Sequence, residues 1–317
     1  MKISVGVFFG GRSVEHEVSV VSALQAIHTL DKEKYRVVPI YMSKDGKWYT
    51  GKELLSIDNF KQMEELLEKS TEIYMTPAHE DFGIFKKETG LFEKPLIDNI
   101  DLAFPILHGT FGEDGALQGF FELKGLPYVG CDVLSSAVGM DKIMMKMVLK
   151  DRGLPIVDFH WFLDREWYRD KDVIIEEIEK LGYPLIVKPA NLGSSVGISK
   201  AANRDELITA IELASSFSQR LLAEKMVKDL KEINCSVIGY STNLEASVCE
   251  EPLKSDDILS YKDKYLSDSS SSKGMSGTKR KIPADLPPEM SDQIQQLAKD
   301  TFRILGCAGV SLSLIHI

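Results

Sequence analysis

The residues best suited to chemistry lie between positions 183 and 198, where Lys188 ends an apolar run and a small Gly/Ser-rich segment follows. The run is rich in Val and Ile, which predicts a strand covered on both faces, so the ammonium group at its end needs an anionic partner or access to water. The glycines of residues 193–197 lack a Cβ, so backbone N–H groups and the hydroxyls of Ser194 and Ser195 can approach phosphate oxygens closely. The segment therefore favours a phosphate-binding site.

The same segment matches G-x-S-x-G, the motif of serine hydrolases, which requires a helix immediately after the serine. Here residues 196–199 are typical of an extended return strand, and the next helix is expected only after Asn203, where Glu206 would complete a capping box. A β-loop-β flap over a phosphate is therefore favoured over a nucleophilic serine. Neither G-x-x-x-x-G-K-[ST] nor G-x-G-x-x-G occurs, so a P-loop enzyme and a dinucleotide oxidoreductase are not supported.

Other charged residues fall at the edges of expected elements in the same region: Lys142, Lys225, Glu224 and Glu232. Each lysine by itself is more often a solvated surface residue, and the glycine segment by itself is as well explained by a structural turn. Together with Lys188 they would suit a nucleotide, with the cations on its phosphates and the carboxylates accepting hydrogen bonds from adenine or ribose.

The composition restricts the class of protein. The 317 residues suggest about two domains, although three small ones would also fit. A formal net charge of −10 argues against general nucleic-acid binding, which needs a basic face. Four cysteines without a C-x-x-C pair suggest neither a disulfide framework nor a zinc site, which fits a reducing cytoplasm. The N-terminal apolar run is too short for a signal peptide, and no apolar run approaches the roughly 18 residues of a membrane span.

The N-terminal part of the chain shows strands alternating with helices. Strands are predicted at residues 3–9, 35–41 and 102–107, and helices at 17–30 and 116–124. This alternation predicts an α/β fold with a doubly wound parallel sheet, whose ligands bind at the carboxyl ends of the strands. Two glycine loops, at residues 10–11 and 109–115, fall at such ends. The polar stretch up to about residue 98, with a charged helix near 58–69, reads as solvated surface.

The pattern changes after residue 135. One helix is predicted from residue 135 to 150, ended by Gly153, and its methionines read as core filling rather than as a cofactor site. Later elements are predicted as strands at 157–162, 183–188, 221–227 and 232–240 and as helices at 173–181 and 288–305. The polar segment 255–281 reads as either a functional or a disordered loop.

Five motifs follow one another along the chain: FGGRSVEHEVS at 9–19, LHGTFGEDG at 107–115, MDK at 140–142, the segment 188–197, and KY at 264–265. Their order resembles that of the D-alanine–D-alanine ligases, from residue 1 to about 311. The resemblance implies the ATP-grasp fold, in which two α+β lobes hold ATP beside an N-terminal domain. It implies an N-terminal domain at 1–131, a central lobe at 132–222 and an incomplete C-terminal lobe at 223–317.

Carried over by position, the resemblance assigns two residues to the amino-acid substrate. Glu15 would hold the ammonium group of the first D-alanine, and His108 would lie beside the same substrate. By itself, Glu15 would read as an acid favoured by the N-terminal end of a helix dipole, and His108 as a loop residue.

The resemblance also implies how ATP is held: the phosphates by Lys142, Lys188, Ser194, Ser195 and Lys264, the adenine by Glu224, Lys225 and Val227, and the ribose by Glu232. Ser194 would lie on a loop that closes over the site. Tyr265 would bond to Glu15 and Ser194 and so join this loop to the substrate, which makes these three the implied catalytic residues. The alternative for Tyr265 is a surface aromatic in a flexible segment.

The implied reaction has two steps. ATP phosphorylates the carboxylate of one D-alanine, and the amine of a second attacks the acyl phosphate to give D-alanyl-D-alanine for peptidoglycan precursors, ADP and phosphate. Mg²⁺ would accompany ATP, and the resemblance fits a cytoplasmic enzyme that could be a homodimer, with no nucleic-acid or membrane partner. Tyr265 favours D-alanine as the second substrate. A D-alanine–D-lactate or D-serine ligase stays open, as does a nucleotide-binding protein without catalysis.

The end of the chain departs from the family. After Ser311 the family continues with an arginine, an aspartate two residues later and then a Glu-x-Asn pair, whereas this chain has LSLIHI at residues 312–317. The arginine stabilises the transition state in the family, and the three other residues hold its two magnesium ions. We therefore expect a truncated or foreign tail, no protein ligands for magnesium, an exposed side of the C-terminal lobe, and no ligase activity in this chain.

Overall fold

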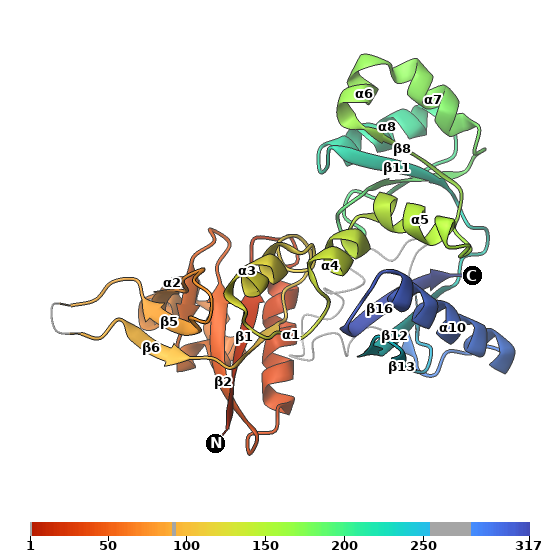
Figure 1. Ribbon diagram of the computed structural model, residues 1–317. Coiled ribbons are helices and arrows are strands. Elements are labelled where there is room, and N and C mark those ends of the chain that lie inside the picture. The colour runs from red at the N-terminus through yellow and green to blue at the C-terminus, as the bar shows by residue number, and fades with distance from the viewer. Residues whose placement is uncertain (1, 91–92, 254–279) are drawn as a thin grey trace. The chain divides into compact units, whose positions relative to one another are not determined.

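The computed structural model describes residues 2–90, 93–253 and 280–317. The chain divides into two compact units, an N-terminal unit, Met1–Ser136, and a C-terminal unit, Ala137–Ile317 (Figure 1). Lys264, Tyr265 and most of the expected 255–281 loop lie outside the described residues. The domain boundaries after residues 131 and 222 stay a prediction.

The N-terminal unit contains a seven-stranded mixed sheet of order β6-β5-β4-β3-β2-β1-β7. Three strands pair in parallel with β1 in the middle: β1 (Ile3–Gly10), β2 (Tyr35–Met42) and β7 (Leu102–Pro105). These are the three strands predicted from the sequence. Four antiparallel strands extend the sheet beyond β2: β3 (Trp48–Thr50), β4 (Thr71–Tyr74), β5 (Gly83–Lys86) and β6 (Leu96–Asn99). They occupy the stretch expected to be solvated surface, because runs this short show too little alternation to indicate a strand.

Helices cover both faces of this sheet. Successive residues of a strand point to opposite faces, so Val7 and Phe9 join one hydrophobic cluster and Phe8 joins the other. The first face packs against α1 (His16–Thr29), η1 (Lys52–Leu55), η2 (Ile57–Lys61) and α2 (Met63–Lys69). The second packs against α3 (Ala116–Lys124), which ends at Gly125 as predicted. The carboxyl ends of β1 and β7 therefore lie at one edge, held by a rigid core.

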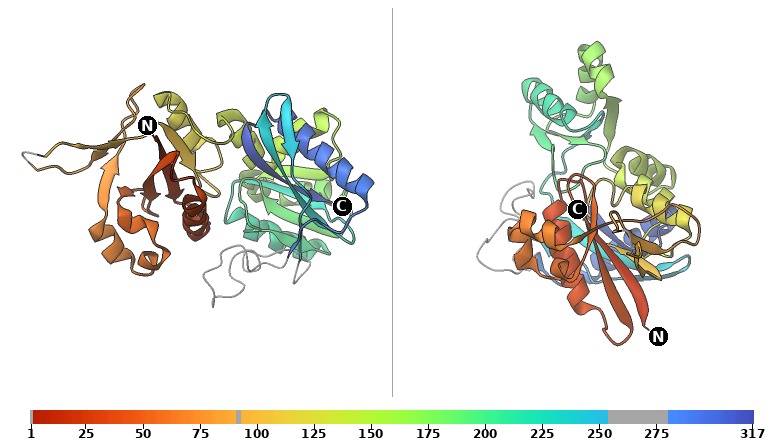
Figure 2. Two further views of the ribbon diagram at one scale, coloured as in Figure 1. Left: turned by 90° about the horizontal axis from the view of Figure 1, so that it is seen from below. Right: turned by 90° about the vertical axis from the view of Figure 1, so that its left-hand side faces the viewer.

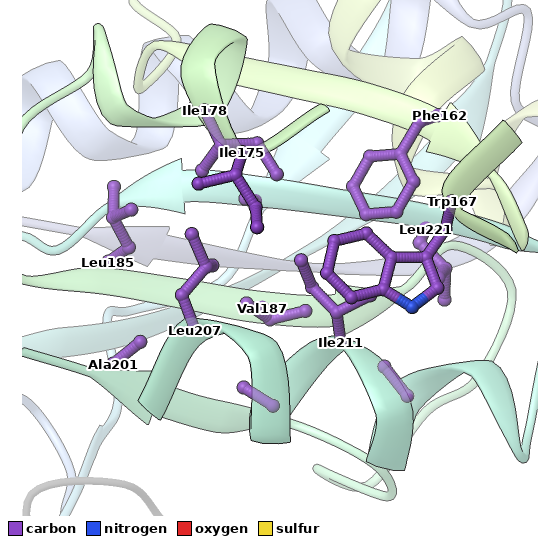
Figure 3. Close-up of a cluster of buried hydrophobic side chains, with 13 residues drawn as sticks. Phe162, Trp167, Ile175, Ile178, Leu185, Val187, Ala201, Leu207, Ile211 and Leu221 are labelled. Atoms are coloured by element: carbon purple, nitrogen blue, oxygen red, sulfur yellow. The ribbon is translucent and has the colours of Figure 1, made fainter. Parts of the chain in front are cut away.

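The C-terminal unit contains a four-stranded antiparallel sheet of order β10-β9-β11-β8. Its strands are β8 (Phe159–Leu163), β9 (Leu185–Pro189), β10 (Ser199–Ala201) and β11 (Arg220–Lys225). One face is covered by α6 (Asp164–Arg169), α7 (Lys171–Glu179) and α8 (Arg204–Ser215). Figure 3 shows α7 and α8 packing Ile175, Ile178, Leu207 and Ile211 against these strands. Asn203 caps α8 as predicted, since its side chain accepts a hydrogen bond from the backbone of Glu206.

The single helix expected at residues 135–150 is wrong, because two helices, α4 (Val133–Met140) and α5 (Lys142–Asp151), occupy this region. Asp141 interrupts them with an extended backbone, and its carboxylate accepts hydrogen bonds from the N–H groups of Ile143 and Met144. A side-chain cap of this kind satisfies donors that the first turn of a helix leaves unpaired. Arg220 holds the cap with Nε 2.9 Å from Oδ2 of Asp141. Lys142 is thereby fixed as the first residue of α5.

A second sheet of the C-terminal unit has the order β13-β12-β16 (Figure 2). Its strands are β12 (Glu232–Tyr240), β13 (Asn243–Ala246) and β16 (Gly309–His316), and a separate pair consists of β14 (Glu251–Pro252) and β15 (Arg280–Lys281). The helix α10 (Pro288–Ile304) packs Ile294, Ala298 and Phe302 against one face of β12. Nowhere in the described part of the chain does a helix have the length and apolar character needed to cross a bilayer.

Candidate functional site

A buried ion pair joins the two central strands of the four-stranded sheet. Lys188 on β9 lies opposite Leu222 on β11, and Glu224 lies opposite Ile186, so the two charged side chains share one face and are diagonal neighbours. Their ammonium and carboxylate groups form a hydrogen-bonded ion pair. Glu224 is only 5% exposed. The cation expected at the end of this strand therefore has an anionic partner within the chain.

A second lysine approaches the same carboxylate. Lys146 on α5 places its Nζ 2.9 Å from Oε2 of Glu224, and its side chain is 12% exposed. Burial opposes ionisation of Glu224, but the charges of Lys188 and Lys146 hold the pKa of this carboxyl group below its usual value. The carboxylate is therefore ionised at neutral pH. Two cations around one anion leave one positive charge to attract an anionic ligand.

Lys142 lies at the glycine-rich loop that follows β9. Its Nζ donates hydrogen bonds to the carbonyl groups of Leu192, at 2.5 Å, and Ala190, at 3.4 Å, and its backbone N–H also bonds to Ala190. The structure thus brings Lys142 to the loop that carries Ser194 and starts directly after the Lys188 strand. Lys146 was missed by the sequence analysis. Its signal was the four-residue spacing from Lys142, which puts both on one side of α5.

The loop itself has an unusual backbone. Ser194 and Ser195 have positive φ angles of 51° and 61°, which are uncommon for residues with a side chain. Gly197, with φ 71°, leaves no room for a side chain, because a Cβ there would lie 2.8 Å from Cγ of Pro189. Such strained backbone is found most often at ligand sites and switch regions. The return strand β10 begins at Ser199, later than the expected start at residue 196, because residues 194–197 form a turn. The β-loop-β order is confirmed, and it contradicts the turn-helix geometry of a serine hydrolase.

Three further residues assigned to the nucleotide lie nearby in the sequence. Lys225 is exposed, and the alternation along β11 points it to the face opposite Glu224. Val227 is half-buried just after the strand. Glu232 begins β12 and lies opposite His316 on β16. The contacts of these three residues with adenine and ribose stay predictions.

The N-terminal unit has its own polar cluster at the carboxyl ends of β1 and β7. Glu15, at the start of α1, is 5% exposed, and its backbone N–H donates to Oγ of Ser13. That hydroxyl in turn donates to the carbonyl of His108 at 2.6 Å. A Cβ on Gly109 would lie only 2.4 Å from Oε2 of Glu15, so the carboxylate lies against this glycine. The structure therefore brings together Glu15 and His108, which the sequence assigned to one substrate.

Burial sets the protonation of this cluster. It lowers the pKa of His108, although the charge of Glu15 opposes the change, so the imidazole is neutral at pH 7. Glu113, which the sequence analysis did not single out within its motif, is exposed as a whole residue, but its carboxylate is part-buried and accepts a hydrogen bond from the N–H of Gly109 at 2.6 Å. Loss of water around that carboxyl group raises the pKa of Glu113 to about 7, and the charge of Glu15 contributes. Glu113 therefore titrates near neutrality.

Comparisons with known proteins agree with this arrangement. A model of the D-ala D-ala ligase N-terminus matches residues 4–131, and a model of the D-ala D-ala ligase C-terminus matches residues 148–312. The D-alanine–D-alanine ligase of Natranaerobius thermophilus is 42% identical over 313 residues, which cover 98% of this chain and 80% of that protein. That of Thermosipho melanesiensis is 38% identical over 309 residues, or 97% of this chain and 80% of the relative.

Solved structures show the same likeness. The VanG D-Ala:D-Ser ligase of Enterococcus faecalis superposes with a TM-score of 0.82 and 31% identity, covering 99% of this chain and 86% of that one. The D-alanine–D-alanine ligase of Coxiella burnetii superposes with a TM-score of 0.77 and 30% identity, covering 99% of this chain and 80% of that one.

The fold and these likenesses define an α/β ligase with the ATP-grasp fold, as predicted. Enzymes of this class form a bond at the expense of ATP and release ADP. The chain belongs to the D-alanine–D-alanine ligase family, whose members use ATP in the synthesis of peptidoglycan precursors.

The described residues contain no cluster that would hold a metal ion by protein ligands alone, whereas Mg²⁺ usually binds through one or two carboxylates together with the phosphates of the nucleotide. Across residues 2–90, 93–253 and 280–317, no group of three or more His, Cys, Asp or Glu side chains is placed to hold a metal. The structure does not test the inactivity expected from residues 312–317, and a measurement of phosphate release separates it from the activity proposed below.

Proposed function

We propose that this chain binds ATP on its C-terminal unit and D-alanine on its N-terminal unit, and that it ligates two D-alanines. The observation that carries the proposal is the cluster of Lys188, Glu224 and Lys146 beside the glycine-rich loop and Lys142. Buried cations in excess over carboxylates, next to a loop of closely approachable backbone N–H groups, are the groups that a triphosphate requires.

In this proposal Lys142 and Lys188 change partners when the nucleotide binds. Lys142 now donates to backbone carbonyl groups and Lys188 to Glu224, so both ammonium groups are already ordered near the loop. A phosphate oxygen carries negative charge, so it attracts the ammonium group of Lys142 more strongly than a neutral carbonyl oxygen does. Ser194 and Ser195 would close over the phosphates. Adenine and ribose would contact the residues named from the resemblance: Glu224, Lys225, Val227 and Glu232.

The N-terminal unit would hold the amino acid. Glu15 offers a buried carboxylate to the substrate ammonium group, and the neutral His108 adds no positive charge that would compete with it. Ser13 and Gly109 fix the position of the Glu15 backbone and carboxylate. Such a charge-assisted contact would orient the substrate carboxylate for reaction.

ATP, when bound, supplies the phosphoryl group that turns a D-alanine carboxylate into an acyl phosphate. The work of the chain is then electrostatic and steric. The lysines neutralise charge that develops on the transferring group, and the loop excludes water that would hydrolyse the intermediate.

One observation, the superposition on a D-Ala:D-Ser ligase, favours a second substrate other than D-alanine. Supplying D-alanine with D-serine or D-lactate, and identifying the product by mass spectrometry, separates these reactions.

We also propose that the protein acts in the cytoplasm without nucleic-acid or membrane partners. Light scattering during gel filtration tests whether it is a homodimer.

The proposal is tested by calorimetric titration with ATP and by phosphate release with ATP, Mg²⁺ and D-alanine. ATP binding with release above a no-enzyme control indicates an active ligase. ATP binding without release contradicts the proposed ligation and indicates a nucleotide-binding protein without catalysis. A chain that is folded by circular dichroism yet binds neither ATP nor D-alanine contradicts the proposal.

A further inference from the structure

Lys146 is the one member of the buried cluster to which the sequence and the family resemblance give no role. It shares the carboxylate of Glu224 with Lys188, but the two lysines differ in what else surrounds them. The ammonium group of Lys146 lies 5.3 Å from the ring centre of Phe159 and 3.5 Å from the carbonyl of Val157. Lys188 is next to the end of β9, where the glycine-rich loop begins. Lys146 is therefore the lysine held in place.

The two lysines also use different oxygens. Lys188 hydrogen-bonds to Oε1 of Glu224, whereas Lys146 pairs with Oε2. The approach of Lys146 at 2.9 Å is an ion pair outside hydrogen-bond geometry, since Oε2 is a buried atom without a well-directed donor. Because the two lysines contact different oxygens, departure of Lys188 would leave the contact between Lys146 and Oε2 intact.

That independence matters for ligand binding. A phosphate that draws Lys188 away from Glu224 would, without Lys146, leave a carboxylate that is 5% exposed and has no counter-ion. Removing one partner of a buried charge pair is strongly unfavourable, and the stranded group commonly takes up a proton instead. The nucleotide would have to offset this cost, so its affinity would fall.

We propose that Lys146 is a positioning residue, the permanent counter-ion of Glu224, which allows Lys188 to move from that carboxylate to a nucleotide phosphate. The inference rests on the proposed ATP site of the C-terminal unit. The titratable groups facing Glu224 are Lys188 from β9 and Lys146 from α5, and β8 contributes Phe159. With Lys146 present, Glu224 stays ionised throughout binding and no proton is exchanged at this site.

The test is isothermal calorimetry of ATP with the full chain near pH 7.5, in two buffers of different ionisation enthalpy, which reports both affinity and proton uptake. The variants are Lys146→Met, Lys146→Arg and a matched control on the same helix, Lys150→Met. Lys150 is 64% exposed, and it lies 3.8 Å from the carboxylate of Asp158, which is itself 75% exposed. Thermal unfolding monitors the folding of each variant.

We expect Lys146→Met to weaken ATP binding about tenfold or more and to add uptake of close to one proton per ATP bound, relative to the unchanged chain. Lys146→Arg should restore most of the affinity and abolish the proton uptake, because it keeps the charge. Lys150→Met should change neither quantity. A role of Lys146 in packing alone would weaken binding without moving the proton count.

A second comparison keeps the inference testable if Lys146→Met does not fold. In a Glu224→Gln background the carboxylate charge is gone, so adding Lys146→Met should leave ATP affinity within about twofold of Glu224→Gln alone. An equal loss in both backgrounds overturns the inference. If the unchanged chain fails to bind ATP, the proposed function falls and this inference with it. If the chain binds ATP but Lys146→Met binds equally tightly without proton uptake, only the inference falls.

Discussion

Adding a single methyl group at Gly109 should weaken D-alanine binding by the N-terminal unit without changing ATP binding by the C-terminal unit. Its φ is +73°, and a Cβ there would lie 2.4 Å from Oε2 of Glu15 and 3.3 Å from Cβ of Ser13. The substitution Gly109→Ala therefore introduces a backbone conformation that residues with a side chain rarely adopt. It also introduces a contact too short to persist, so the Glu15 carboxylate must move.

Two terms give the size of the effect. A left-handed conformation costs a residue with a Cβ about 1–2 kcal/mol. Displacing the Glu15 side chain from its packed position adds a further cost. We therefore expect a total destabilisation of about 2–3 kcal/mol, in the range of overpacked buried sites. Gly119, on α3, is the matched control because a Cβ there meets nothing within 4 Å. Gly119→Ala should stabilise the protein by about 0.5–1 kcal/mol, since alanine is the better helix former.

Urea unfolding should show a lower free energy of unfolding for Gly109→Ala, and a higher one for Gly119→Ala, than for the parent protein. Calorimetry should show weaker D-alanine binding by Gly109→Ala, while ATP binding on the C-terminal unit is unchanged. Gly119→Ala should bind both ligands like the parent. A Gly109→Ala protein with parental stability and parental D-alanine affinity would refute the placement of Glu15 against this glycine.

Three further outcomes are expected. Asp141→Ala removes the cap of α5 and the partner of Arg220, so urea unfolding should show a loss of about 1–2 kcal/mol. Lys142→Met removes the side-chain hydrogen bonds to the glycine-rich loop, and limited proteolysis should cut within that loop sooner, with ATP affinity reduced at least several-fold. For Glu113 the folded-state pKa of about 7 lies above the ordinary 4.5, so the folded state binds the proton more tightly: its contribution to stability is full below pH 4.5 and is lost as pH rises to 7. Glu113→Gln should flatten that part of the stability profile measured by urea unfolding, and an unchanged slope would contradict the raised pKa.

Strong local sequence patterns predicted many of the helices and strands. The apolar runs that became β1, β2 and β7, and the glycine that ends α3, were predictable because a buried strand and a helix C-terminus leave clear residue signals. The break at Asp141 was not, because the flanking residues are good helix formers and only the cap hydrogen bonds reveal the interruption. The short strands from β3 to β6 are held by pairing with neighbours rather than by their own sequence.

The candidate sites show the same division. Lys188 and Glu15 belong to motifs whose residue order resembles a known family, so both could be named from the sequence. Lys146 and Glu113 were not named, although Lys146 lies four residues after Lys142 and Glu113 lies in the motif at 107–115, because their significance comes from a neighbour distant in the sequence or from the local loss of water. The pairing of Lys188 with Glu224 required the register of β9 and β11, which no single-strand pattern contains.

The most direct test of a nucleotide site in the C-terminal unit is a crystal structure of this chain with a non-hydrolysable ATP analogue. We expect Lys142 and Lys188 within hydrogen-bond distance of phosphate oxygens, the loop of Ser194 folded over them, and Glu224 still paired with Lys146. Analogue bound elsewhere, or phosphates bound while Lys188 remains on Glu224, would contradict the site described here.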